Sequence, residues 1–169
     1  MDKTIIIYRS KTGFSRRYAQ WLAEDLRCQA ADFRERNRLR LPEYGTIILA
    51  GGLDAGQMSG LGWLKKQLPG LAGKRIAALA VGCAPADTPD LPESMEKLFG
   101  PLPQVRGFYC QGGLDYEHMG AVDRAMMAAL RASLRGKPEM ADMLAGISRS
   151  FDAADRSSLA PLVQWARNA

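Results

Sequence analysis

The chain has 169 residues, of which 47% are hydrophobic. We therefore expect one domain whose hydrophobic core is large enough to be stable without disulfides or a structural metal. No apolar run approaches the roughly 20 residues that span a bilayer, and the first residues lack a secretory signal pattern. Composition thus excludes a membrane-spanning protein, a disordered chain and a small disulfide scaffold. The net charge of +5 lies within residues 1–40, which hold ten Lys or Arg against five Asp or Glu.

Residues 4–9 form a nearly continuous apolar run, typical of a parallel strand buried on both faces. A polar turn follows, and residues 14–28 then have the spacing of an amphipathic helix. A weak strand is predicted at 30–33 and a second strong strand at 44–50. The second strong strand runs into a segment at 53–60 that we expect to be a flexible loop.

The second half continues the alternation of strands and helices. A short helix at 61–68 ends at Pro69-Gly70 and leads to a strong strand at 74–81. The remaining predicted elements are a helix at 93–99, a strand at 105–110, and helices at about 118–134, 138–145 and 157–168. This alternation predicts right-handed βαβ units and a parallel sheet.

Small or hydroxyl-bearing residues follow the strong strands. Ligands of open α/β sheets bind beyond the carboxyl ends of the strands, so we expect the loops there to converge on one ligand. The most specific indication of a ligand site is the segment Ser10-Lys11-Thr12-Gly13-Phe14-Ser15, between the first strand and the first helix. Its hydroxyls, its glycine and the free amides of the helix start suit a phosphate. The alternative is that Ser10 or Thr12 only caps the helix.

Cysteine and histidine are too sparse for a metal or thiol-redox motif. Cys28, Cys83 and Cys110 form no CxxC pair, and His118 is the single histidine. We therefore expect a reducing, cytoplasmic compartment, no metal site and no Ser/His/Asp hydrolase. The basic stretch 34–40 is either a solvated loop or a surface for an anionic partner. Peripheral contact with the inner face of an anionic membrane is one such interaction, and we expect no nucleic acid partner.

The segment 10–15 resembles the T/S-x-T-G-x-T phosphate loop of flavodoxins, with serine in place of the last threonine. The resemblance extends to Ile5-Ile6-Ile7-Tyr8, to Gly112-Gly113-Leu114-Asp115-Tyr116, to Asp123-Arg124-Ala125-Met126-Met127 and to Ser158-Leu159-Ala160-Pro161-Leu162-Val163. These segments look like the flavodoxin-domain group related to flavodoxin-type protoporphyrinogen IX dehydrogenases. The resemblance thus covers nearly the whole chain.

This resemblance implies a single flavodoxin-like α/β domain over residues 1–169. It would be a three-layer sandwich with a five-stranded parallel sheet in the order 2-1-3-4-5, elaborated by helices at 112–157. FMN would lie at the carboxyl edge, with flavin-centred chemistry and no catalytic side chain. The cofactor-binding residues it implies are Ser10, Lys11, Thr12, Gly13, Phe14 and Ser15; Gly52, Leu53, Asp54, Ala55 and Gly56; and Gly82, Cys83, Ala84, Pro85 and Asp90.

The resemblance implies an FMN-dependent oxidoreductase that acts on a redox substrate, either a porphyrinogen or a quinone. The alternative is a flavodoxin-type electron carrier with a protein partner. The sequence departs from electron carriers in two ways. Its loops at 53–55 and 84–87 carry no aromatic residue to sandwich the flavin, and its net charge is positive rather than acidic. A third alternative is a binding module that has lost its flavin, but the intact hydroxyl loop weighs against it.

Several residues keep two interpretations. The methionines at 119, 126, 127, 140 and 143 form either a lid over the flavin or ordinary helix-on-sheet packing. Cys83 is either a redox thiol or a small structural residue. Asp115 either lines the pocket or caps the next helix.

Overall fold

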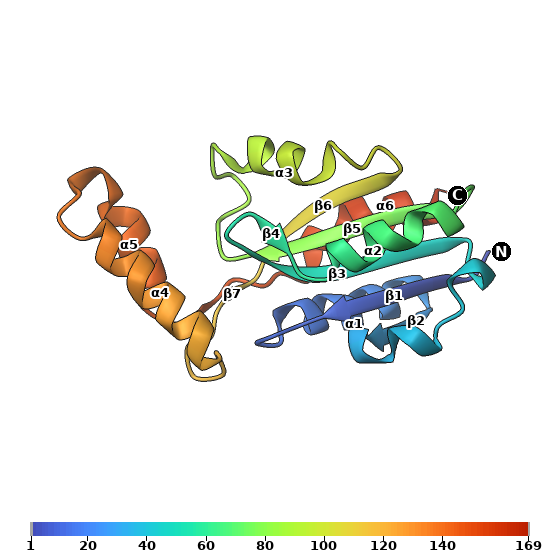
Figure 1. Cartoon of the computed structure of the whole chain (residues 1–169), viewed down its shortest axis with the longest axis horizontal. Helices are drawn as coiled ribbons and strands as arrows, with labels where there is room; N and C mark the ends of the chain where they lie inside the picture. Colours follow the sequence, from blue (N-terminus) through green and yellow to red (C-terminus); the bar gives the residue numbers. More distant parts are fainter. Residues whose placement is uncertain (1, 169) are drawn as a thin grey trace.

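The computed structural model describes residues 2–168, and its centre is a parallel β-sheet with helices on both faces (Figure 1). The parallel strands are β1 (Thr4–Arg9), β2 (Gln29–Asp32), β3 (Thr46–Asp54), β5 (Arg75–Gly82) and β6 (Val105–Gln111). Their order is β2-β1-β3-β5-β6, which confirms the predicted 2-1-3-4-5 arrangement when only these strands are counted. The change of direction between β1 and β3 is the switch point where such sheets bind ligands.

Two hydrophobic layers follow from the alternation of side chains along the strands. Ile6 lies in a cluster with Tyr18 and Leu22 of α1 (Phe14–Leu26) and Leu162 of α6 (Ala160–Arg167). Ile5 and Ile7 lie in the opposite cluster, which contains residues of α2 (Leu61–Gln67) and α3 (Leu91–Phe99). The helices therefore cover both faces of the sheet, as a three-layer sandwich requires.

Short 3-10 segments complete the connections. They are η1 (Phe33–Arg38), η2 (Leu41–Glu43), η3 (Leu68–Gly70), η4 (Pro138–Met140) and η5 (Arg156–Leu159). Within residues 2–168 we found no helix with the length and apolar character needed to cross a membrane.

The prediction of a flexible loop at 53–60 is wrong. Strand β3 continues to Asp54 and folds back on β4 (Gln57–Met58) as an antiparallel hairpin. The two connecting residues, Ala55 and Gly56, have positive φ values of 48° and 76°. Two-residue hairpins of this kind favour positive φ at both central positions, usually with Asn-Gly. Because Ala-Gly lacks that signal, the sequence did not reveal the turn.

Residues 113–152 form a projection that we call the arm. It leaves the sheet at β7 (Gly113–Leu114) and returns at β8 (Phe151–Asp152), and these strands pair antiparallel. The arm carries α4 (Ala121–Leu134) and α5 (Ala141–Ile147), which extend beyond the end of the sheet (Figure 1). The predicted helices are therefore present, but they do not pack on the sheet.

Candidate functional site

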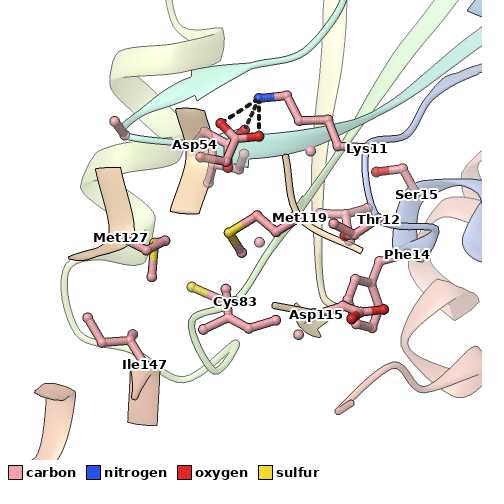
Figure 2. A pocket seen from close by; sticks show the side chains of 18 of the residues that line it. Lys11, Thr12, Phe14, Ser15, Asp54, Cys83, Asp115, Met119, Met127 and Ile147 are labelled. Atoms are coloured by element: carbon pink, nitrogen blue, oxygen red, sulfur yellow. Dashed lines mark hydrogen bonds and ion pairs between the residues drawn. The ribbon is translucent and has the colours of Figure 1, made fainter. Parts of the chain in front are cut away.

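A cavity of about 420 Å³ opens where β1, β3 and β5 end, and the arm forms its far wall (Figure 2). Three predicted loops reach it. The predicted residues that line it are Ser10, Lys11, Thr12, Phe14, Ser15, Gly52, Leu53, Asp54, Ala55, Gly82 and Cys83. The predicted residues Gly13, Gly56, Ala84, Pro85 and Asp90 are not among the lining residues. The convergence of distant loops at this edge follows from the parallel sheet.

The 10–15 loop presents unpaired helix amides to the cavity. Gly13 is the N-cap of α1, with a φ of 103° that favours glycine, and no side chain caps this helix. Ser10 Oγ instead accepts a hydrogen bond from the Gly13 amide at 3.0 Å. The Arg17 amide donates to the Gly13 carbonyl at 3.0 Å, so the amides of 14–16 have no partner within the helix. These amides and the positive end of the helix dipole form a suitable phosphate site.

Lys11 points away from this loop and bridges two other elements (Figure 2). Its Nζ lies 3.2 Å from Asp54 Oδ2 on β3 and 3.3 Å from Asp123 on α4. Partial burial would lower the pKa of Lys11, but the two carboxylates more than offset this and raise the pKa above its ordinary value. Lys11 therefore links the arm to the β3–β4 hairpin.

Gly52 provides an open approach to the cavity along β3. A Cβ atom built at Gly52 would meet no atom within 4 Å, whereas one at the neighbouring Gly51 would lie 2.2 Å from the Ser59 carbonyl oxygen. Close packing against Ser59 therefore requires glycine at position 51, but no contact within the protein requires it at position 52. A bare backbone on a cavity wall suits the close approach of a flat ligand.

Two side chains of β6 hold the loop that follows β5. Tyr109 Oη donates to the Ala84 carbonyl at 2.6 Å, and Gln111 Nε2 donates to the Cys83 carbonyl at 3.0 Å. A Cβ at Gly82 would lie 2.7 Å from Tyr109 Oη, so glycine gives this tyrosine room. Neither anchor could be predicted from the sequence, because both side chains come from a neighbouring strand that is distant in the chain. The half-buried Cys83 thiol has its pKa raised by burial, which favours a neutral structural residue over a reactive thiolate.

The arm supplies the apolar wall. The side chains that line the cavity from it are those of Met119, Met126, Met127, Leu130, Met143 and Ile147. Met126 and Met143 remain about half exposed, at 52% and 49%, so they do not belong to a packed core. This finding favours the lid interpretation over helix-on-sheet packing for the four methionines that line the cavity, whereas Met140 does not line it. Phe14 is the aromatic residue among the side chains that line this cavity.

Asp115 lines the cavity and does not cap α4, whose N-cap is Gly120. Its carboxylate accepts from the His118 amide at 3.2 Å and lies 2.6 Å from His118 Nδ1. The hydrogen bond to the His118 side chain is the main cause that lowers the pKa of Asp115. The side chain of His118 is mostly exposed.

Comparison with known proteins shows the family of the chain. The flavodoxin domain family matches residues 5–141, which is most of the chain. The chain therefore belongs to the flavodoxin domain family, and FMN is the cofactor that this membership implies. A comparison with curated proteins found no match.

Solved structures with a similar fold were also found. The Trp repressor binding protein from Bacillus subtilis is 17% identical, over 80% of this chain and 98% of that one, with a TM-score of 0.47. A flavodoxin from the domain Archaea is 17% identical, over 65% and 85% of the two chains, with a TM-score of 0.41.

The cavity fits the parts of FMN. The uncapped amides and hydroxyls of the 10–15 loop suit a phosphate dianion. The bare backbone at Gly52 and the apolar wall of the arm suit a flat ring system. Bound FMN would supply a reversible acceptor of electrons or hydride at this sheet edge.

The first prediction concerns the hydroxyl of Thr12. We expect Thr12→Ala to weaken FMN binding by about 1.5–3 kcal/mol, because one hydrogen bond to a charged phosphate is lost. Titration of FMN fluorescence would measure the dissociation constant. Thr4→Ala, at the opposite end of β1, is the matched control and should leave it unchanged. Equal affinities for both variants would contradict the assignment of Thr12.

The second prediction concerns the link between Lys11 and the arm. Asp123→Asn removes one of the two carboxylates that raise the pKa of Lys11, so that pKa should fall. The Lys11 side chain is 53% exposed, so the lost stability should be only about 0.2–1 kcal/mol. Hydrogen exchange in α4 should nevertheless become faster. Asp142→Asn on α5 is the control, and identical exchange in both variants would show that the ion pair does not restrain the arm.

Proposed function

We propose that this flavodoxin-family protein is an FMN-dependent oxidoreductase whose substrate is a small molecule with an apolar ring system, of the porphyrinogen or quinone class. The observation that carries this proposal is the methionine-rich wall that faces the loops after β3 and β5. Methionine is flexible and polarisable, and it adapts to large flat ligands. A carrier that meets only protein partners has no need of such an apolar wall.

Different residues of the cavity bind the phosphate, orient the ring and exclude water. Thr12, Ser15 and the first amides of α1 bind the phosphate, which fixes one end of the cofactor. The backbone at Gly52 and the anchored loop at Gly82 and Cys83 orient the ring. The side chains of the arm exclude water from the opposite face, which is where the substrate binds.

The charge of the chain supports an anionic or membrane-dissolved substrate. The net charge of the chain is +5, whereas the cavity itself is lined by Arg9 and Lys11 together with Asp54, Asp115 and Asp123, so the excess positive charge lies on the surface outside it. A positive surface favours carboxylate-bearing porphyrinogens and an anionic membrane that carries quinones. In each cycle the donor would lose two electrons to the flavin, and the acceptor would then gain two from it.

Anaerobic stopped-flow absorption of the FMN-loaded protein tests the proposal. We expect protoporphyrinogen to reduce the bound flavin, and a short-chain quinone to reoxidise it, faster than either reacts with free FMN. Flavin that reacts with neither at an enhanced rate, but exchanges electrons with a reductase protein, would favour the electron-carrier alternative and contradict the proposal.

A further inference from the structure

A second concavity, which we call the basic groove, adjoins the phosphate loop. It has a volume of about 740 Å³, and the residues that line it are Arg9, Ser10, Asp32, Phe33, Arg34, Arg36, Trp63 and Lys66. Arg9 and Ser10 line both this groove and the flavin cavity. The groove nevertheless lies over η1 and α2 rather than under the arm, so the proposed redox function does not use it.

Most of the positive charge in the groove has no carboxylate partner, although Arg36 donates a hydrogen bond to the Phe33 carbonyl at 3.0 Å. The Arg34 guanidinium forms two hydrogen bonds with the Asp32 carboxylate, at 3.0 and 2.9 Å, and is neutralised by it. Within residues 2–168, Arg9, Arg36 and Lys66 form no ion pair. Three cations therefore face one groove without a balancing carboxylate.

Two of these cations share one aromatic ring. The guanidinium carbons of Arg9 and Arg36 lie 5.0 and 4.4 Å from the centroid of the Phe33 ring. The ring attracts each of them, but their charges repel one another. A ligand with more than one negative charge would relieve this repulsion. Arginine forks match the oxygen geometry of phosphate especially well.

The wall of the groove also contains an aromatic side chain, Trp63. Trp63 is half-buried on α2 and lies edge-to-face with Phe33, with ring centroids 5.3 Å apart and an angle of 83° between the planes. This contact holds the indole in a fixed orientation beside the cations. Indole faces bind planar rings by stacking, and this would add base recognition to phosphate binding.

We propose that the basic groove binds a phosphorylated nucleoside, with its base against Trp63 and its phosphates between Arg9, Arg36 and Lys66. A flat membrane surface would not use the concave shape or the oriented indole. An acidic peptide would not need the aromatic wall. This second ligand would lie next to the flavin phosphate, because the two concavities meet at Arg9 and Ser10.

Isothermal titration of the protein with ADP, in excess FMN to keep the 10–15 loop occupied, tests this proposal. We expect ADP to bind, uncharged adenosine not to bind, and inorganic pyrophosphate to bind at least about tenfold more weakly than ADP. Arg36→Ala combined with Lys66→Ala should weaken ADP binding at least about tenfold. The matched control is Arg38→Ala with Lys65→Ala, which removes the same charge from exposed neighbours outside the groove and should change affinity less than about twofold.

Trp63→Leu separates the base contact from the phosphates. It should bring the affinity for ADP down to that for pyrophosphate, and retained FMN binding would show that the variant is folded. Absence of ADP binding, equal losses in the two double variants, or equal affinities of the wild-type protein for ADP and pyrophosphate would each overturn the proposal. So would binding to vesicles of phosphatidylglycerol and phosphatidylcholine through Arg36 and Lys66 without ADP binding.

Discussion

Gly52→Val should abolish tight FMN binding and leave the protein folded. Nothing lies within 4 Å of a Cβ atom at this position, so the new side chain fits the fold and projects into open space on the cavity wall. Valine also suits a strand interior. The flavin ring would then meet two methyl groups where it needs bare backbone. We expect a loss of about 3 kcal/mol, which corresponds to more than a hundredfold in affinity.

Fluorescence titration would measure the affinity for FMN. Urea unfolding of the protein without FMN would measure the free energy of unfolding. Gly62→Val on α2 is the matched control, because a Cβ there also meets nothing within 4 Å and lies outside the cavity. The free energy of unfolding should change by less than about 1 kcal/mol for Gly52→Val. Unchanged FMN affinity in Gly52→Val would show that the ring does not approach β3.

The second large effect is expected from a charge placed in the apolar wall. Met127 lies half-buried at the cavity (Figure 2), so Met127→Glu would put a carboxylate where the proposed substrate packs. Burial of an unpaired charge is unfavourable, and we expect the KM for a quinone or porphyrinogen to rise about 10- to 100-fold. FMN affinity should change little, because its phosphate is held elsewhere.

Met140→Glu is the matched control for this experiment. Met140 is on the same arm but is exposed and does not line the cavity. Steady-state kinetics of both variants with the same quinone would distinguish the effect of a charge on the cavity wall from the effect of a charge elsewhere on the arm. Equal KM values for the two variants would contradict the role of the arm as a substrate wall.

The parallel sheet could be predicted from the sequence because buried strands are apolar along their whole length. Ile5-Ile6-Ile7 and Ile47-Ile48-Leu49 have no polar face, which distinguishes them from strands of a half-exposed sheet. The strands β4, β7 and β8 have two residues each and are too short for any period. The hairpin and the base of the arm therefore appear only in the structure.

The phosphate loop was similarly visible, because its hydroxyls and glycine lie within six consecutive residues. The partners of Lys11 were not, since Asp54 and Asp123 are 43 and 112 positions away in the chain. Tyr109 and Gln111 were missed for the same reason, as each acts on a loop 25 or more positions away. The basic groove combines residues from β1, η1 and α2, and only the fold brings them together.

The relative affinity of the protein for FMN and riboflavin tests the role of the 10–15 loop most directly. The two flavins share the same ring, and only FMN carries the phosphate that the free amides of α1 would bind. Fluorescence titration of both ligands should show that FMN binds at least about a hundredfold more tightly than riboflavin. Equal dissociation constants for FMN and riboflavin would show that this loop does not hold the phosphate.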